Sequence, residues 1–353
     1  MHIEARHLTK SFGSFRATDN VSFGIEKGKL IGLLGPSGGG KTTILRMLAG
    51  LEEPDSGDIL FHGQRVNDLA PQARGIGFVF QNYALFRHMT VFDNIAFGLT
   101  VQKKSKAQIK ARVEELIELT GLKGLTGRLP HQLSGGQRQR VAFARAIAPE
   151  PRVLLLGEPF AAIDAKVRKE LRTWLKEMID RVGITTIFVT HDQEEAVEVA
   201  DQIMIINHGR LEQQGTPIEI YKKPRTPFVA GFIGESNQLG DISNLKGFEA
   251  DLLPNARAII RPEFIEIGRP GEVSYPSAAE QGTVKQVYFR GINWQVEVEV
   301  EGDRLFAYRS PELPELKIGE QVQVLIHRVY LFNEQDQLTQ ENGLKGDPMP
   351  VHI

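Results

Sequence analysis

The stretch GPSGGGKTT, residues 35–43, constrains the fold of this chain more than any other feature. It satisfies the pattern GxxxxGK[ST] and lies between the apolar run LIGLL and the amphipathic run KTTILRMLAG, which Gly50 closes. In that setting glycines let the backbone fold around phosphates, and amides at the helix start attract anionic oxygens. A glycine-rich turn before a helix is the simpler alternative, but the preceding strand, Lys41 and Thr42 together favour a phosphate-binding loop.

Short apolar runs alternate with amphipathic segments from the N-terminus to about residue 235. KLIGLL, RVLLL and TTIFVT suit strands that are covered on both faces. DAKVRKELRTWLKEMIDRVG carries its apolar residues on one helical stripe before Gly183. This alternation predicts an α/β domain around a parallel sheet over residues 1–235.

After about residue 240 the sequence changes to short β-like segments. QVEVEVE, residues 295–301, alternates apolar and charged side chains, which predicts a strand with one solvent-facing side. We interpret residues 236–353 as a small all-β domain, a barrel or a sandwich. Its strands contain no motif typical of phosphate or metal ligands, so we expect it to regulate and not to catalyse.

Composition limits the classes of partner and chemistry. The 353 residues are enough for two domains, and a net charge of -2 gives no global field for nucleic acid, which is a disfavoured partner. Cysteine is absent, which excludes a thiolate nucleophile or ligand and suits a reducing cytoplasm. The N-terminus lacks an apolar signal-peptide core, and no apolar run approaches the roughly 18 residues of a membrane helix. A membrane role therefore requires a partner.

A second phosphate-binding pattern occurs in LSGGQRQRVAFARAI, residues 133–147. Ser134 can cap a helix whose exposed amides, including those of Gly135 and Gly136, can hold a phosphate. Taken alone, such a serine is more often a cap than part of a ligand site. Beside a phosphate-binding loop the ligand role is favoured, so either one chain holds two nucleotides or two chains share them.

Together these motifs resemble those of the ATP-binding subunits of ABC transporters. GPSGGGKT resembles the Walker A loop, LSGGQ the family signature, VFQ the Q-loop, VLLLGEPF a Walker B strand, AAID the D-loop and VTHDQEE the switch-histidine segment. They follow the family's order over about residues 3–235. The resemblance implies an α/β P-loop NTPase of ABC type, with a parallel-sheet core and a helical subdomain at about residues 85–150, followed by a small all-β, barrel-like domain.

The resemblance implies that ATP and Mg²⁺ are cofactors. It assigns nucleotide binding to these residues: Phe12, Gly35, Ser37, Gly38, Gly39, Gly40, Lys41, Thr42, Thr43, Gln81, Ser134, Gly135, Gly136, Gln137 and Asp164. Lys41 would reach the outer phosphates, while Thr42 and Gln81 would hold Mg²⁺. Glu158 would polarise the attacking water, and His191 would contact the outer phosphate and that water.

Several of these residues have alternative roles. Phe12 would stack on adenine, but Phe15 competes for that role and a small core aromatic is the simpler alternative. Asp164 can link two chains, cap the helix that follows, or do both. Glu158 and His191 can be an acidic residue at a strand end and a histidine in a polar loop, but six matched motifs in order favour the functional roles.

In this family two chains close head to tail, which implies a homodimer with ATP on Lys41 of one chain and Ser134 of the other. The aromatic-rich segment NYALFRHMTVFDNIAFGL after Gln81 can be core, and we favour a groove for a helix of an integral membrane permease. FQNYALFRHMTVFDNIAFGLTV and FIGESNQL resemble the ATPases of sulfate and thiosulfate importers, and IIRPEFIEI resembles a regulatory domain of bacterial importers. This likeness implies an anion-binding protein that acts through the permease, and a peripheral place on the cytoplasmic face of the cell membrane.

Gly157 departs from the family pattern, in which the Walker B strand ends in an aspartate. Mg²⁺ would keep Thr42, the phosphates and waters, so binding can survive. Hydrolysis is expected to be slow, because misplacement of about 1 Å can cost around a hundredfold. A non-hydrolysing ATP sensor is the alternative that Gly157 supports.

Three other functions compete with sulfate import. The same ATPase can serve an importer of sugars, polyamines or metals. A soluble ABC ATPase of DNA repair or translation would usually bring a coiled-coil insertion or a second cassette. A nucleotide or small-molecule kinase is disfavoured by LSGGQ and the switch histidine.

Overall fold

The computed structural model describes residues 1–161, 165–240, 242–249, 252–333 and 336–345. The chain divides into two compact units, Met1–Ile220 and Tyr221–Ile353. This division precedes the predicted boundary at residue 235 because helix α8 (Pro227–Phe232) packs on strand β12 (Arg257–Ile260). Ala230 of α8 lies in the core of the second unit.

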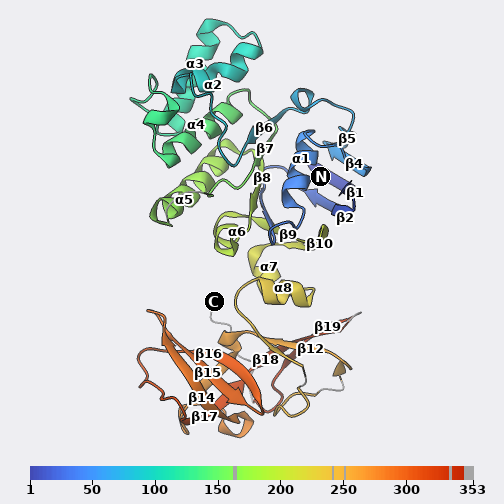
Figure 1. Ribbon diagram of the computed structural model, residues 1–353, viewed down its shortest axis with the longest axis vertical. Helices are drawn as coiled ribbons and strands as arrows, with labels where there is room; N and C mark the ends of the chain where they lie inside the picture. The colour runs from blue at the N-terminus through green and yellow to red at the C-terminus, as the bar shows by residue number, and fades with distance from the viewer. Residues whose placement is uncertain (162–164, 241, 250–251, 334–335, 346–353) are drawn as a thin grey trace. The chain divides into compact units, whose positions relative to one another are not determined.

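A six-stranded sheet organises the first unit (Figure 1). Its strands, in spatial order, are β10 (Arg210–Gly215), β9 (Gln202–Asn207), β3 (Leu30–Leu34), β8 (Thr185–Thr190), β7 (Val153–Leu156) and β6 (Ile76–Val79). All neighbours run parallel except β10, which is antiparallel to β9. Every residue of β3, β7 and β8 is buried, which confirms that the apolar runs form strands covered on both faces.

A second, antiparallel sheet lies in the same unit. It comprises β2 (Phe15–Ile25), β1 (Ile3–Phe12), β4 (Ser56–Phe61) and β5 (Gln64–Arg65). Helix α1 (Lys41–Ala49), closed by Gly50, shares one apolar core with both sheets, and that core includes Leu8, Leu33 and Ile44.

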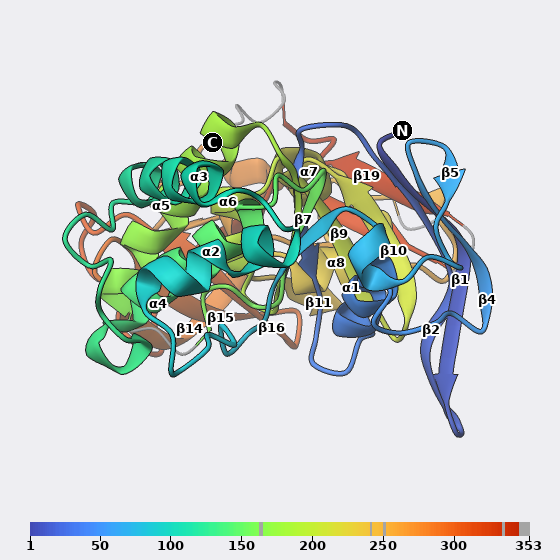
Figure 2. The ribbon, with the colours of Figure 1, turned by 90° about the horizontal axis from the view of Figure 1, so that it is seen from above.

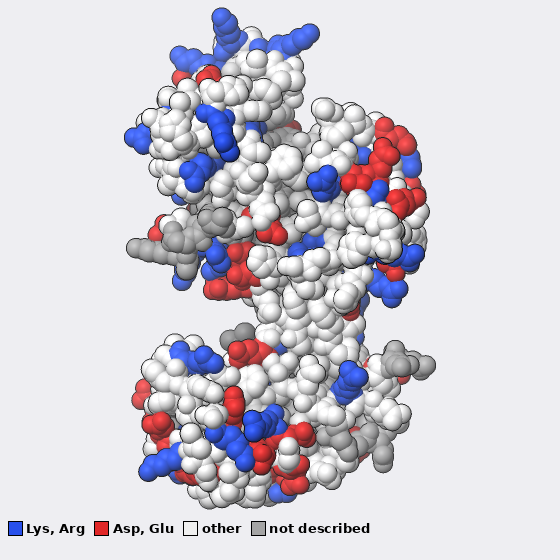
Figure 3. All heavy atoms as spheres, in the orientation of Figure 1, with Lys and Arg blue, Asp and Glu red and all other residues white. Residues whose placement is uncertain are grey.

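The described residues of this unit form six further α-helices: α2 (Val91–Val101), α3 (Lys106–Leu119), α4 (Gly135–Ile147), α5 (Ala165–Val182), α6 (Gln193–Val199) and α7 (Pro217–Lys222), which ends just past the division. Helix α2 packs on α3 and α4, and α4 packs on β6, so these helices form the helical subdomain (Figure 2). Lys and Arg side chains gather over it on the face in Figure 3. In the described part of the chain, none of the helices is long and apolar enough to cross a membrane.

The second unit contains two antiparallel sheets. One comprises β11 (Asn237–Leu239), β12, β18 (Arg328–Phe332) and β19 (Gln337–Glu341). The other comprises β13 (Ile265–Gly268), β17 (Gln321–Ile326), β14 (Glu280–Phe289), β15 (Trp294–Val300) and β16 (Asp303–Arg309). From Val296 to Val300, β15 alternates buried and half-buried residues, which confirms the predicted strand with one wetter face.

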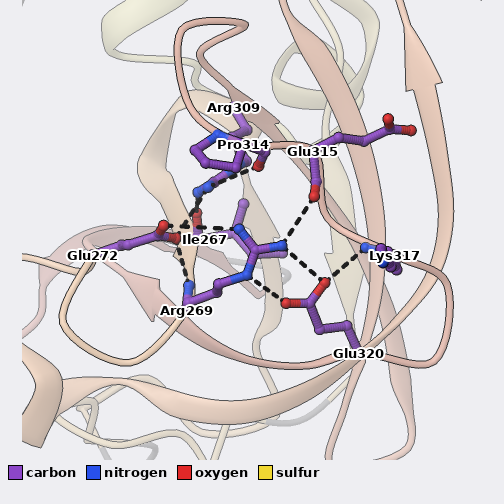
Figure 4. A network of polar contacts seen from close by, with 8 residues as sticks. All are labelled: Ile267, Arg269, Glu272, Arg309, Pro314, Glu315, Lys317 and Glu320. Carbon is purple, nitrogen blue, oxygen red and sulfur yellow. Dashed lines mark hydrogen bonds and ion pairs between the residues drawn. The ribbon is translucent and has the colours of Figure 1, made fainter.

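An ion-pair network fixes one end of the five-stranded sheet (Figure 4). Buried Arg309 pairs with Glu272 at 3.0 Å and donates to the carbonyl oxygens of Ile267 and Pro314. Arg269 pairs with Glu320 at 2.6 Å. Opposite charges are paired within this network, so it stabilises the loops around the sheet and is not a ligand site.

Candidate active site

The phosphate loop follows β3 and leads into α1. A Cβ at Gly35 would overlap the carbonyl oxygen of Ile206, and a Cβ at Gly40 would overlap that of Ala17. Gly40 also has φ 102°, which favours glycine. These two glycines therefore allow the loop to pass close to the backbones of β9 and β2.

The first turn of α1 has backbone amides without a side-chain cap. Its N-cap is Gly40, and the first turn carries no acidic residue. Helices α2, α3 and α4 are instead capped by Thr90, Ser105 and Ser134. Amides that are left unpaired at a helix start favour an anionic ligand. Around them Ser37, Gly38 and Thr42 are exposed, Gly39 is buried and Thr43 is half-buried.

Lys41 is 5% exposed, and its Nζ donates to the carbonyl oxygens of Gly35 at 2.7 Å and Pro36 at 2.8 Å. Burial lowers the pKa of Lys41, and the negative charge of Glu158 partly offsets that shift. A cation removed from water interacts strongly with charge placed beside it. Lys41 is thus suited to contact a phosphate in this loop.

Gln81, Glu158 and His191 follow β6, β7 and β8 at the same edge of the sheet as the phosphate loop. The Gln81 Nε2 donates to Glu158 Oε2 at 2.8 Å, and His191 Nδ1 lies 3.9 Å from the same oxygen. The backbone of Glu158 has φ 48°. The structure therefore brings together three predicted residues that lie far apart in sequence, at the edge where parallel α/β sheets bind ligands.

Thr190 and Glu195, which sequence reasoning missed, support the loop of His191. The Thr190 hydroxyl donates to the carboxyl group of Glu195 and accepts from the backbone N–H of Asp192 at 3.0 Å. Asp192 in turn caps α6. Burial raises the pKa of Glu195. The signal in the sequence is an N-cap aspartate followed by two glutamates after a buried strand.

Gly157 has ordinary backbone geometry. Its N–H donates to the Val79 carbonyl oxygen at 2.8 Å, and a Cβ there would lie 3.5 Å from Val79 O and from the Gln81 nitrogen. Its φ lies outside the region that disfavours side chains. Neither space nor backbone conformation therefore requires glycine at this position.

The donors around the phosphate loop fit a magnesium ion that is held largely by phosphates and water. The Thr42 hydroxyl and the Gln81 amide are oxygen ligands of the kind Mg²⁺ accepts. Within the described residues, no group of three or more His, Asp or Glu side chains can hold a metal. Gly157 leaves out the carboxylate that the family pattern supplies.

The signature residues form a capping box at the start of α4. Ser134 Oγ accepts from the Gln137 N–H at 3.3 Å, and the Gln137 side chain accepts from the Ser134 N–H at 2.9 Å. A Cβ at Gly135 would meet open space, and one at Gly136 would contact Val167. The predicted role of Ser134 as a cap is confirmed.

The signature loop and the phosphate loop lie apart in one chain. Figures 1 and 2 both show α4 and α1 on different sides of the first unit. Among the described residues, no hydrogen bond or ion pair joins residues 134–137 to residues 35–43. One chain alone does not bring these two phosphate-binding elements together.

Phe12 and Phe15 face each other across the tip of the β1–β2 hairpin, where they are 48% and 56% exposed. The alternative that Phe12 is a core aromatic is therefore wrong. Lys10 Nζ lies 5.4 Å from the ring centroid of Phe12. The choice between the two rings for adenine stays open. Asp164 lies outside the described residues, so both its predicted roles stay predictions.

The aromatic segment after Gln81 is partly packed and partly exposed. Phe86 and Phe97 have ring centroids 4.5 Å apart, and Phe97 is 38% exposed. Arg145 donates to the carbonyl oxygens of Tyr83 and Ala84 at 2.8 Å each. Sequence reasoning missed Arg145, whose position in α4 gives no sign of this contact.

Comparison with known proteins agrees with this arrangement. A sequence profile of the ABC transporter family matches residues 18–161, and a TOBE domain profile matches residues 258–329. The chain is 52% identical over 301 residues to a sulfate/thiosulfate import ATP-binding protein of Synechococcus elongatus, covering 84% of this chain and 85% of the relative. The chain belongs to the ABC transporter family of ATP-binding subunits. A second relative, from Bradyrhizobium diazoefficiens, has the same name. It is 47% identical to this ABC ATPase, and the match covers 94% of this chain and 99% of the relative.

Two solved structures resemble the ATPase unit. An ATP-binding cassette solved as a dimer in a post-hydrolysis state with ADP and Pi has a TM-score of 0.55 at 30% identity, covering 61% of this chain and 98% of the other. A cassette of an ABC transporter complex from Clostridium perfringens has a TM-score of 0.59 at 31% identity, covering 63% and 91%. The predicted fold class is confirmed: an ABC-type P-loop ATPase followed by a small antiparallel β domain.

Proposed function

We propose that this ABC ATPase binds and hydrolyses ATP to power import of sulfate or thiosulfate through a separate membrane permease. The observation that carries the ATPase is the convergence of the phosphate loop, Gln81, Glu158 and His191 at one edge of the sheet. The names and identities of the two relatives support the transported anion. Neither of these relatives is named for the import of another solute.

The described residues divide the chemistry among them. Lys41 and the first-turn amides of α1 bind the outer phosphates, and Thr42 and Gln81 hold Mg²⁺. When bound there, the ion would neutralise charge that develops on the phosphates. Glu158 orients the attacking water as a carboxylate beside the outer phosphate, and His191 contacts that phosphate. With Gly157 in place of a carboxylate, we expect this step to be slow.

We further propose a homodimer in which Ser134 and its glycines complete the ATP site of the other chain. The separation of the signature loop from the phosphate loop within one chain supports this assembly, and so does the dimeric cassette. Glu158→Gln should slow hydrolysis and leave binding intact, so that ATP traps a dimer visible by light scattering.

Ser134 provides the matched test of this dimer. Ser134→Arg, added to Glu158→Gln, should abolish the ATP-dependent dimer because a bulky cation occupies the docking position of the phosphate. Ser105→Arg is the control, since Ser105 forms a capping box of the same kind with Gln108 at the start of α3. A dimer that ignores both ATP and Ser134 would refute the composite site.

The permease, we propose, docks on the aromatic segment after Gln81 and holds the ATPase at the cytoplasmic face of the membrane. An anion-binding protein delivers the solute to that permease. Phe97 supports the docking site because it is 38% exposed, and Phe80, just before Gln81, is 43% exposed. Phe97→Asp should prevent copurification with coexpressed permease subunits and spare ATP binding. Val101→Asp, on the same helix, is the control; equal copurification of both variants would place the permease elsewhere.

The β-rich region after residue 235, we propose, regulates the ATPase. The charges around Arg309 are used in structural pairs, which supports a role outside the chemistry. Removing it should change the ATPase rate in the assembled importer and leave nucleotide affinity unchanged. A loss of nucleotide affinity in the folded, shortened chain would contradict this division of roles.

A further inference from the structure

A cavity of about 650 Å³ opens at the amino ends of β3, β7 and β8, at the edge opposite the phosphate loop. Lys27 lies before β3, Arg152 before β7 and Ile184 before β8. Its volume falls in the range of small-molecule sites, roughly 300–1,000 Å³. The nucleotide site does not use this cavity, because the two lie at opposite ends of the same parallel strands.

Positive charge exceeds negative charge in the lining. Four lysine and arginine side chains line the cavity: Lys27, Arg112, Arg152 and Arg181. Both acidic side chains in the lining, Glu115 and Glu150, lie near Arg112, at 2.8 and 3.9 Å. Within the described part of the chain, no ion pair joins Lys27, Arg152 or Arg181 to an acidic group. Three cations therefore remain for a ligand.

Two histidines lie beside these cations in the cavity lining. His2 is 6% exposed, its ring centroid lies 4.1 Å from that of His62, and its Nε2 lies 3.3 Å from the Arg152 carbonyl oxygen. Burial lowers the pKa of His2, and the neighbouring His62, Lys27 and Arg152 lower it further, while the contact with the Arg152 carbonyl oxygen partly offsets them. Lys27 and Arg152 line the cavity beside His2 and form its basic subsite.

Apolar side chains and helix C-termini also line the cavity. Leu119 and Ile147 line it, and the last residues of α4 and α5 reach the cavity with their partial negative charge. An anionic group is therefore favoured beside Lys27 and Arg152, and an apolar or neutral body fits beside Leu119 and Ile147.

We propose that this cavity is a second ligand site, for a small organic molecule that carries a phosphate or sulfate group. The oxyanion contacts Lys27 and Arg152, whose guanidinium can bind two oxygens at once. The organic body rests against Leu119 and Ile147. Cavity size selects a molecule larger than a free inorganic anion, because such an anion fills a small part of about 650 Å³.

Calorimetry on the full chain tests this site. The chain is first saturated with Mg²⁺ and a non-hydrolysable ATP analogue, so that the phosphate loop is covered, and is then titrated with ribose 5-phosphate. Lys27→Gln with Arg152→Gln should weaken binding about tenfold or more, since charge-assisted contacts to the oxyanion are lost. Lys106→Gln with Lys169→Gln removes the same charge from exposed helix positions outside the cavity and should change nothing.

Two further titrations separate the parts of the ligand. Ribose, without the phosphate, should not bind, and inorganic sulfate should bind more weakly than ribose 5-phosphate with the same loss in the Lys27 and Arg152 variant. The NMR signal of the His2 ring, assigned with His2→Gln, should report a raised pKa in the complex, because the anion offsets neighbouring positive charge. Binding of neither anion, or equal affinity in the variant and its control, would overturn the site.

Discussion

Gly157→Asp should raise the rate of ATP hydrolysis. The end of β7 has room for the new side chain, because a Cβ would lie 3.5 Å from Val79 O and from the Gln81 nitrogen, which is ordinary contact. The carboxylate would start beside Gln81 and Glu158, whose side chains are 2.8 Å apart. It would therefore join the oxygen ligands that hold Mg²⁺ next to the reacting phosphate.

The size of the increase in hydrolysis rate follows from the negative charge of the new aspartate. A hydrogen bond or contact to a charged group contributes about 1.5–3 kcal/mol. Each ~1.4 kcal/mol of transition-state stabilisation is a tenfold change in rate, so we expect a gain of about tenfold to a hundredfold. The fold should tolerate the change: Gly157→Ala should raise the free energy of unfolding by about 0.4–1 kcal/mol, because alanine has less freedom in the unfolded chain.

Phosphate release at saturating ATP, measured across a series of Mg²⁺ concentrations, checks this expectation. Gly157→Asn is the matched control, because it has the same size as aspartate and no charge, and its rate should stay close to that of the parent. Half-maximal activity of Gly157→Asp should need less Mg²⁺. The reasoning fails if the parent already hydrolyses ATP at a rate normal for such ATPases and Gly157→Asp changes neither the rate nor the Mg²⁺ requirement.

Three other changes test separate parts of the molecule. Lys41→Ala should weaken ATP binding about tenfold or more by calorimetry, because a buried cation facing the phosphates is lost. Glu195→Gln should raise the melting temperature at pH 7. Burial raises the folded-state pKa of this carboxyl group, so its ionisation lowers the stability of the fold above that pKa. The difference in melting temperature between the variant and the parent should therefore vanish below pH 4.5, the ordinary pKa of the group. Chains ending at residues 220 and 235 should both bind ATP. The longer chain should be less soluble, because α8 then has an apolar face that β12 no longer covers. A folded, shortened chain that does not bind ATP would contradict this expectation.

Local features of the site could be predicted from sequence, because glycine, lysine and capping residues determine the structure of residues only a few positions away in the chain. The phosphate loop and the cap at Ser134 are of this kind, and the helix closed by Gly50 is another. Features that depend on strand order could not. The hydrogen bond from Gln81 to Glu158 joins residues that meet only because β6 and β7 are neighbours in the sheet.

Exposure and backbone conformation were equally inaccessible to sequence reasoning. Aromatic rings at Phe12 and Phe15 suit a core or a surface, and only pairing of β1 with β2 places both at an exposed tip. A glycine at position 157 is compatible with a left-handed backbone, which the structure does not have there. The basic cavity around His2 also could not be predicted, since its lysine and arginine residues come from four separate segments that carry no common motif.

The place of β3 in the sheet affects how the chain folds during its synthesis. This five-residue, wholly buried strand lies between β8 and β9, both of which are made much later. On a ribosome adding about 5–20 residues per second, roughly 150 residues separate β3 from its first neighbour, a delay of about 8–30 s. Throughout that interval LIGLL has neither partner strand, so the nascent chain carries an apolar strand with unpaired edges, which favours aggregation until β8 and β9 are made.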